Sequence, residues 1–374
     1  MKKKILIVSS EFPPGPGGIG THAYSLAKSL AMNQYNVCVL TLSDYVSKKE
    51  RSQFDKNQKD LKIYRQSNLL KGIDQIARIV KYLILVKCFK PNVIFYTGRF
   101  GLYCSLFSIS RKFIQIKIVH GSEINPNGRI EKFINQLSIR KSYKIVAVSE
   151  FTRRLITDNI KKINFADIVV IHNGLLNALL EKWKVKREIE DFNSDVLNLL
   201  TVGNVIPRKG QQNVIHALPK LITKYPNLTY DIVGAPCNKK SLMHLAKTLS
   251  ILENIKFHGR VTDFSDLDKY YNSADIFFIL SENLEDGDVE GYGIVVLEAN
   301  YFGIPVIGSV GTGIESAVQN HYNGILVDPK NPEEILQSVN EIIDNYEQYK
   351  VNSIKWAQKN NWDNLVNQYI KIIE

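Results

Sequence analysis

Residues 290–298 read Glu-Gly-Tyr-Gly-Ile-Val-Val-Leu-Glu, a glycine-rich turn that runs into an apolar segment. From Ile294 onward the segment is apolar on nearly all sides and continues to a stop at Gly303-Ile304-Pro305, which predicts a buried helix. Glu298 lies within that helix, and a buried carboxylate without partners costs several kcal/mol. We therefore expect hydrogen-bond donors around Glu298, and the hydroxyls of a bound sugar would serve.

Glu290 lies on the loop that leads into this helix, which we expect to start at Tyr292. Gly291 and Gly293 would let the backbone turn sharply and leave N–H groups free at the helix N-terminus, where anions and hydroxyls bind. A purely structural reading remains open. Glu290 would then be a helix-start carboxylate that the helix dipole stabilises, and Glu298 would belong to an internal polar network.

The whole chain has the size and composition of a two-domain globular protein. It contains 374 residues, of which 44% are hydrophobic and 23% charged, and a domain usually has about 100–200 residues. Its four cysteines have no close pair, so we expect neither a disulfide framework nor a zinc site, and a reducing compartment. No apolar run approaches the ~20 residues of a membrane span, and the start at Met1 predicts a first strand rather than a signal peptide.

Charge is divided unequally along the chain. Residues 1–190 contain 33 Lys and Arg against 14 Asp and Glu, a balance of +19, whereas residues 191–374 contain 15 against 23, a balance of −8; together they give the net +11. A basic N-terminal half attracts anionic partners such as nucleic acid, phospholipid or a diphosphate-bearing substrate. The alternative is that much of this charge is simply solvated surface.

Short β-branched runs alternate with helical stretches throughout the first half, as in parallel sheets covered on both faces. The expected strands are Ile5–Ser9, Val37–Ser43, Val93–Tyr96, Ile116–His120, Lys144–Val148 and Ile168–His172. The expected helices include Ile19–Asn33, Leu70–Phe89 and Phe151–Asn159. This order predicts a doubly wound α/β domain.

A charge-rich run at 181–195 predicts a linker, and a second α/β series follows it. Its expected strands are Leu197–Val202, Thr229–Val233, Lys256–Phe257, Ile276–Leu280, Pro305–Ser309 and Ile325–Val327. Its expected helices are Gln212–Tyr225, Lys239–Leu252, Tyr292–Phe302 and Glu333–Tyr349. Two such domains would bind ligands in a cleft between them, at the carboxyl ends of the strands.

The stretch Gly15-Pro-Gly-Gly-Ile-Gly20 matches the dinucleotide-binding pattern G-x-G-x-x-G, with Asp44 placed to bind a ribose. That pattern should follow its strand almost directly, yet the proline-containing run 10–14 intervenes, so a dehydrogenase is disfavoured. A loop of free amides opening a helix could still hold a phosphate or a sugar.

Three further groups have polar chemistry at turns. Arg208 and Lys209 follow the first strand of the second half, where cations can neutralise a diphosphate. His120 ends a strand at the expected cleft, where it could donate to a substrate oxygen or move a proton. Asp286 and Asp288 resemble a metal-binding pair, but we favour an ordinary polar loop. Short basic turns and structural histidines are common alternatives.

Two segments, 70–89 and 102–114, mix aliphatic and aromatic residues with Lys and Arg. Segments of this kind can lie on an anionic membrane. For each segment alone, packing against its own sheet is the favoured interpretation.

The assembled pattern resembles a retaining glycosyltransferase of the GT-B fold, in the family called GT4, nearly from end to end. The most specific match is the pair Glu290 and Glu298, spaced E-x7-E. The others, in the family's order, are the glycine-rich first loop, His120-Gly121, Val148-Ser-Glu-Phe-Thr152, His172-Asn-Gly174, Arg208-Lys-Gly210, Gly311-Thr-Gly-Ile-Glu315 and Asn323-Gly324.

The resemblance implies that the second half binds a nucleotide sugar and the first half binds the acceptor. Glu298 would contact the ribose, Glu290 the donor sugar and Lys209 the diphosphate; amides of Gly291, Tyr292 and Gly293 would contact the sugar, and His120 would lie by the reacting carbon. Gly17, Gly18 and Gly20 would belong to the acceptor side. The family needs no metal ion, and the anomeric configuration would be retained. Lys209 and the helix N-terminus would stabilise charge on the leaving diphosphate.

The chain departs from the family at Asn204, where many relatives have an arginine after the first strand of the second half. We expect Arg208 or another basic residue to replace it. The resemblance also implies a last helix, around 356–372 with Trp356 and Trp362 as anchors, that crosses back to the first domain. The expected domains are 1–185, completed by 356–374, and 195–355.

The expected function is therefore a metal-independent, retaining hexosyltransferase (EC 2.4) that uses a UDP- or GDP-type donor and no cofactor. Its acceptor would be a saccharide or lipid-linked hydroxyl in bacterial-type polysaccharide or glycolipid synthesis. We expect a cytoplasmic protein, and the +19 balance predicts that it lies peripherally on the inner face of the membrane. A sugar-nucleotide epimerase and a non-catalytic nucleotide-sugar binder remain open. No recognition motif supports a nucleic-acid binder.

Overall fold

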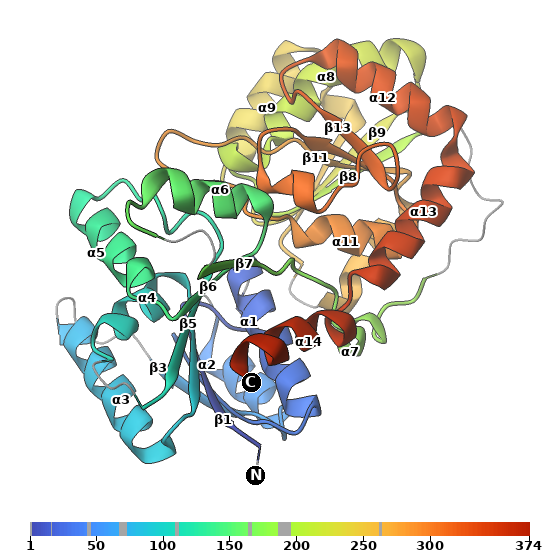
Figure 1. Ribbon diagram of the computed structural model, residues 1–374. Helices are drawn as coiled ribbons and strands as arrows, with labels where there is room; N and C mark the ends of the chain where they lie inside the picture. Colours follow the sequence, from blue (N-terminus) through green and yellow to red (C-terminus); the bar gives the residue numbers. More distant parts are fainter. Residues whose placement is uncertain are drawn as a thin grey trace. The chain divides into compact units, whose positions relative to one another are not determined.

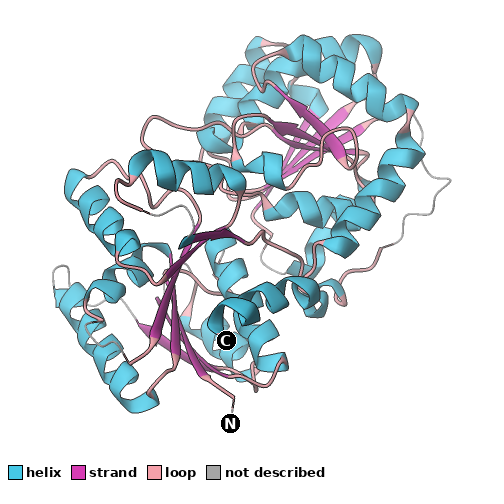
Figure 2. Ribbon diagram, viewed as in Figure 1, coloured by secondary structure: helices cyan, strands magenta, loops and turns pink. Residues whose placement is uncertain are grey.

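The computed structural model describes residues 2–15, 17–42, 46–66, 73–108, 112–163, 167–185, 196–261 and 264–374. The chain forms two compact units (Figure 1): unit 1 comprises Met1–Asn173 and Trp362–Glu374, and unit 2 comprises Gly174–Asn361. In each unit, helices lie on both sides of a single sheet (Figure 2). Among the described helices, none has the length and apolarity that crossing a bilayer requires.

The described strands of unit 1 form a parallel sheet in the order β3-β2-β1-β4-β5-β6-β7. The strands are β1 (Lys4–Ser9), β2 (Asn36–Leu42), β3 (Lys62–Gln66), β4 (Val93–Thr97), β5 (Ile114–Val119), β6 (Lys144–Ala147) and β7 (Ile168–Val170). The central strands are buried along most of their length because helices cover both faces. The order reverses between β1 and β4, which makes their carboxyl ends a topological switch point.

The helices of unit 1 are α1 (Gly18–Met32), α2 (Lys48–Lys56), α3 (Ile73–Phe89), α4 (Gly98–Leu106), α5 (Arg129–Arg140), α6 (Glu150–Asn159) and α14 (Trp362–Ile373). Side chains of α3 and α4 pack with alternate residues of β1 and β2, including Leu6 and Leu40, in one core cluster. Helix α14 packs on α1, and its Tyr369 contacts Phe95 of β4. Because neighbouring residues of a strand point to opposite faces, α3 and α4 cover one face and α1 and α14 the other.

The described strands of unit 2 form a parallel sheet in the order β10-β9-β8-β11-β12-β13. They are β8 (Asn198–Val202), β9 (Thr229–Val233), β10 (Ile255–Gly259), β11 (Ile276–Ile279), β12 (Val306–Ser309) and β13 (Gly324–Val327). The helices are α7 (Asn177–Leu180), α8 (Gln211–Lys224), α9 (Lys239–Thr248), α10 (Asp268–Ser273), α11 (Ile294–Tyr301), α12 (Pro332–Asp344) and α13 (Tyr346–Lys359). The switch point lies between β8 and β11.

The predicted pair of doubly wound α/β domains is confirmed, and three local differences have physical reasons. Strand β3 was not predicted because it lies at the sheet edge and its sequence, Lys-Ile-Tyr-Arg-Gln, is mostly polar. Helix α2 was not predicted either, although Ser47 and Glu50 form a capping box at its start. The single helix expected at Glu333–Tyr349 is two helices, α12 and α13, separated at Asn345.

The C-terminal crossing begins at Trp362 rather than at Trp356. Trp362 is buried in unit 1, where its ring stacks on Tyr369 and contacts His22 edge-on. Trp356 lies on α13 in unit 2 and donates a hydrogen bond to the carbonyl of Ala317 at 2.8 Å. Asp44, the start of the expected helix at 70–72 and most of the expected linker, 186–195, lie outside the described residues; residues 181–185 belong to unit 2.

Candidate active site

The candidate donor site of unit 2 is built at the switch point of its sheet. Strand β8 ends at Val202 and leads to a 3₁₀ turn, Pro207–Lys209, before α8. Its neighbour β11 leads to the loop that contains Asp288 and Glu290, and that loop enters α11. Because both strands are parallel, the two loops emerge at the same edge of the sheet, where open α/β sheets bind ligands.

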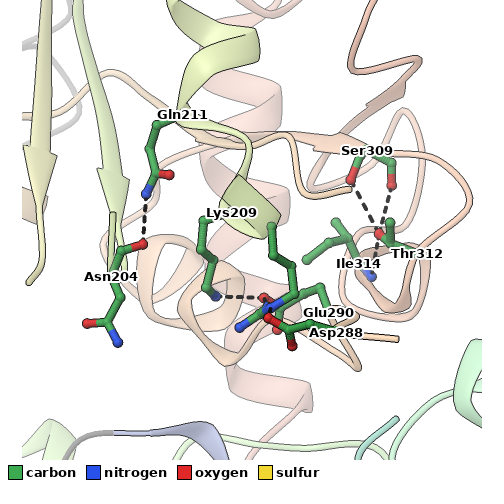
Figure 3. A network of polar contacts seen from close by, with 9 residues as sticks. Asn204, Lys209, Gln211, Asp288, Glu290, Ser309, Thr312 and Ile314 are labelled. Carbon is green, nitrogen blue, oxygen red and sulfur yellow. Dashed lines mark hydrogen bonds and ion pairs between the residues drawn. The ribbon is translucent and has the colours of Figure 1, made fainter. Parts of the chain in front are cut away.

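A cluster of four charged residues joins these loops (Figure 3). Lys209 donates from Nζ to Glu290 Oε2 at 2.6 Å, and Arg208 donates from its guanidinium to the same oxygen. The Arg208 Nε atom also lies 3.0 Å from Asp288 Oδ2. The sequence predicted all three of Arg208, Lys209 and Glu290 as site residues, and the structure brings them together.

The electrostatics of the cluster keep Glu290 ionised. Burial raises the pKa of Glu290, but the charges and hydrogen bonds of Lys209 and Arg208 outweigh burial and lower its pKa to about 2. Burial lowers the pKa of Arg208, but the carboxylates of Glu290 and Asp288 outweigh burial, so its pKa is raised above the usual value. Two cations therefore lie where an anion could bind. In the structure both of them pair with Glu290.

Glu298 is buried on α11 and has the donor that its position requires. Tyr271 of α10 donates its hydroxyl to Glu298 Oε2 at 2.7 Å. Burial raises the pKa of Glu298 to about 7, against the hydrogen bond from Tyr271 and the charge of Lys209, which both lower it. Lys209 thus influences both carboxylates of the E-x7-E pair. A carboxyl group with a pKa near 7 can accept hydrogen bonds from sugar hydroxyls.

The loop 291–293 has a tight backbone that only glycines allow. Helix α11 starts at Ile294, not at the expected Tyr292, because Gly293 takes a left-handed conformation at the N-cap, with φ 84°. Tyr292 is therefore a buried loop residue. The neighbouring turn approaches so closely that a Cβ on Gly313 would lie 2.1 Å from the carbonyl oxygen of Gly291. The Gly313 N–H donates to the carbonyl of Glu290 at 2.8 Å, which fixes the path of this loop.

The Asp286–Asp288 segment forms a polar loop attached to the cation cluster. The amide of Asp288 donates to Asp286 Oδ1 at 3.0 Å, and the Asp288 carboxylate pairs with Arg208. Over the described ranges, no group of three or more His, Cys, Asp or Glu is arranged to hold a metal ion. At Asn204, where the sequence lacks the expected arginine, the backbone carbonyl accepts a hydrogen bond from Gln211 Nε2 at 3.1 Å.

His120 lies in unit 1, just beyond β5. Its Nε2 is 2.8 Å from Thr97 Oγ1, and its ring contacts the His22 ring edge-on. Burial lowers the pKa of His120 to about 3. The imidazole is therefore neutral near pH 7, which suits it to hydrogen bonding with a substrate oxygen rather than to acting as a cation.

The glycine-rich loop before α1 holds a carboxyl group of its own chain. The Gly20 N–H bonds to Glu11, and a Cβ on Gly17 would lie 2.0 Å from Glu11 Oε2. Gly18 has open space around it and opens the helix, and Pro16 lies outside the described residues. At least one amide of the loop is therefore used internally, where the sequence suggested amides free for a ligand.

A cavity of about 420 Å³ lies beside this loop, at the switch point of unit 1. Charged and aromatic side chains line part of it: Glu11, Arg78, Arg99, Phe100, Tyr103 and Glu123. Burial raises the pKa of Glu11, and the nearby Glu123 raises it further. Burial also raises the pKa of Glu123, although one of its oxygens accepts from the amides of His120 and Gly121 at 3.1 and 3.0 Å. The cavity is thus polar and rich in hydrogen-bonding groups.

The expected site residues fall into two sets. Unit 2 contains the seven expected donor-binding residues: Arg208, Lys209, Glu290, Gly291, Tyr292, Gly293 and Glu298. Unit 1 contains His120, Gly17, Gly18 and Gly20. The sequence pattern did not indicate three further polar residues: Tyr271, Glu11 and Glu123. Glu11 and Glu123 follow strands β1 and β5 within a few residues, a signal that could have identified them; Tyr271 sits in an ordinary helix with no such signal.

The two doubly wound units have the GT-B fold. Solved structures with this fold match the chain over its length. The crystal structure of HepE from Anabaena in complex with UDP and glucose covers 99% of each chain with a TM-score of 0.79 and 17% sequence identity.

Family comparisons identify the chain more closely. A model described as glycosyl transferases group 1 matches residues 184–360, and one described as Glycosyltransferase Family 4 matches residues 16–175. The chain belongs to the GT4 glycosyltransferases. An uncharacterized glycosyltransferase of Methanocaldococcus jannaschii is 27% identical over 99% of this chain and 97% of its own. A GDP-mannose-dependent phosphatidylinositol monomannoside mannosyltransferase of Corynebacterium glutamicum is 34% identical over 38% of this chain and 36% of its own.

Proposed function

We propose that this glycosyltransferase moves a hexosyl group from a nucleotide-diphosphate sugar to an acceptor hydroxyl, with retention of the anomeric configuration. The observation that carries the proposal is the position of Lys209, 2.6 Å from Glu290 and electrostatically coupled to Glu298. A nucleotide-sugar donor has a diphosphate, a sugar and a ribose. Lys209 would bind the diphosphate, Glu290 the sugar and Glu298 the ribose. No metal ion and no cofactor are required in this proposal.

In the proposed complex, the diphosphate takes over the two cations that Glu290 holds in the free protein. Glu290 is then released to accept hydrogen bonds from the donor sugar, with the amides of Gly291, Tyr292 and Gly293 alongside. Glu298 accepts from the ribose hydroxyls while Tyr271 steadies its other side. As the glycosidic bond breaks, negative charge grows on the leaving diphosphate, and Lys209 stabilises that charge.

The acceptor would bind in unit 1, in the cavity beside Glu11 and Glu123. Two carboxyl groups with raised pKa values, together with Arg78 and Arg99, offer both donors and acceptors to a saccharide. The neutral His120 would donate to an oxygen near the reacting carbon. We propose that the acceptor is a saccharide, free or lipid-linked, in surface polysaccharide or glycolipid synthesis, and that the protein works at the inner membrane surface; the basic N-terminal half supports this location.

The test is a panel of UDP-, GDP- and ADP-sugars, with and without EDTA. We expect one donor to raise the melting temperature, because a ligand that binds only the native state stabilises it, and EDTA to leave that rise unchanged. With acceptor present, the anomeric proton of the product, followed by NMR, should keep the donor's configuration. Conversion of the donor without acceptor would identify an epimerase instead, and binding without turnover would identify a non-catalytic binder.

Arg208 should act as the second diphosphate cation in place of the arginine absent at Asn204. We expect Arg208→Ala to weaken donor binding about tenfold, since a hydrogen bond to a charged group contributes on the order of 1.5–3 kcal/mol. Titration calorimetry with the donor measures the change. Arg153→Ala is the matched control, because Arg153 pairs with Glu150 in unit 1. Donor affinity equal to that of the wild type would show that another residue supplies the second charge.

A further inference from the structure

The outer face of α3 is aliphatic and exposed. Ile76, Val80 and Ile84 are 68%, 47% and 56% exposed, and Leu83 next to them is 43% exposed. Residues spaced by three and four lie on one side of a helix, so these four form a continuous stripe. The opposite side of α3 packs on the sheet through the fully buried Tyr82. A surface helix normally places mostly polar residues on its outer side, whereas the outer side of α3 is mainly aliphatic.

Other exposed apolar side chains extend this surface along the same layer. Helices α3, α4 and α5 lie along one side of unit 1 (Figure 1). Ile130 and Phe133 of α5 are 78% and 67% exposed, and Phe107, directly after α4, is 45% exposed. Most of α4 itself is core, with Leu102 and Cys104 buried. Of the two segments that the sequence suggested for a membrane, α3 therefore remains a candidate and α4 packs on its own sheet.

The charges of this layer are predominantly basic. Residues 73–144 contain 13 Lys and Arg against 3 Asp and Glu, a balance of +10. Where the structure describes the exposure of side chains in this range, which excludes Asp74, the exposed charged residues are basic: Lys81, Lys87, Lys90, Arg99, Lys112, Arg129, Arg140 and Lys141. Aliphatic residues beside a predominantly basic surface match a membrane with an apolar interior and anionic headgroups.

We propose that α3 and α5 form the surface by which this protein docks on an anionic phospholipid bilayer, with Ile76, Val80, Leu83 and Ile84 inserted at the level of the headgroups. The lysines and arginines of the layer attract the anionic headgroups. This gives a location to the membrane association proposed above, and it does not depend on which donor is used. Arg78 and Ile79 of α3 line the unit 1 cavity, so docking would place that cavity beside the lipid.

The test is sedimentation of the full chain with sucrose-loaded vesicles, either phosphatidylcholine alone or an equal mixture with phosphatidylglycerol. We expect binding to the mixed vesicles to be at least about tenfold stronger, since each nearby basic residue contributes about fivefold, and to weaken with added salt. The variant Val80→Glu/Ile84→Glu should lose about tenfold or more in affinity for the mixed vesicles. The matched control is Met32→Glu, because Met32 is 62% exposed at the end of α1, on the other face of the sheet.

Three results would overturn the proposal. One is equal binding to both vesicle types, and another is wild-type binding by Val80→Glu/Ile84→Glu. The third is a wild-type dimer in sedimentation velocity that this variant converts to a monomer, because a second copy of the chain would then cover α3. Donor-induced thermal stabilisation should be the same in wild type and variant. If neither protein were stabilised by a donor, the result would count against the proposed function and not against the docking surface.

Discussion

Replacing Lys209 by methionine should lower kcat by about 10²- to 10³-fold, the loss seen when one group that stabilises developing charge is removed. The side chain keeps its length, but the leaving diphosphate loses the cation that now lies 2.6 Å from Glu290. Donor affinity should fall less than kcat, because negative charge on the diphosphate is greatest in the transition state. Transfer rates at saturating donor, together with titration calorimetry, separate the two effects.

Lys220→Met is the control for this experiment. Lys220 is an exposed lysine of unit 2 that also pairs with a glutamate, Glu333, and its replacement should leave kcat unchanged. A Lys209→Met protein that transfers sugar at the wild-type rate would remove Lys209 from the catalytic step. A protein that binds the donor more weakly but keeps the wild-type kcat at saturating donor would assign Lys209 to ground-state binding alone.

Replacing Glu298 by glutamine should weaken nucleotide-sugar binding by about 100-fold. The ionised carboxylate accepts two ribose hydroxyls in the proposed complex, and each hydrogen bond to a charged group contributes on the order of 1.5–3 kcal/mol. Glutamine keeps the volume and still accepts from Tyr271, but its amide nitrogen cannot accept. The measurement is the donor-induced rise in melting temperature, supported by calorimetry. A wild-type rise in the variant would exclude Glu298 from the donor site.

The same variant carries its own control for folding. The raised pKa of Glu298, about 7 against a usual 4.5, means that the native state holds a proton that the unfolded state releases between these values. The unfolding free energy of the wild type therefore falls as pH rises through this window, by up to about 3 kcal/mol. Without donor, Glu298→Gln should gain stability relative to the wild type from pH 5 to pH 8. Loss of binding then cannot be attributed to a weakened fold.

Much of the fold could be predicted because its signals are local. Short β-branched strands alternate with helices, and each central strand is buried on both faces, so the strand pattern is visible in the sequence itself. The edge strand β3 lacks that signal because one side of it is solvated. The break at Asn345 between α12 and α13 was also invisible, since no proline or glycine marks it. The start of α11 was misplaced because Gly293 takes a left-handed conformation at the N-cap, which the sequence pattern does not specify.

The residues of the candidate site could be predicted from the sequence, but the hydrogen bonds and ion pairs between them could not. The E-x7-E spacing identified Glu290 and Glu298, and the basic turn identified Arg208 and Lys209. Their pairing depends on β8 and β11 being neighbours, which places residues about eighty positions apart on adjoining loops. Tyr271 could not be identified, because only the packing of α10 beside α11 gives it a carboxylate. The role of the glycine-rich loop in holding Glu11 is likewise a property of the folded chain.

The return of α14 to unit 1 affects the order in which the chain can fold during synthesis. Unit 2 is continuous, 174–361, and everything it needs has been made once the ribosome passes its last residue. Unit 1 begins first but ends last, because His22 and Phe95 pack against Trp362 and Tyr369. The core between α1 and the sheet therefore stays open on the nascent chain while all of unit 2 is translated, although domains usually fold in order from the N-terminus. In this protein the second unit to be synthesised is the first that can be completed.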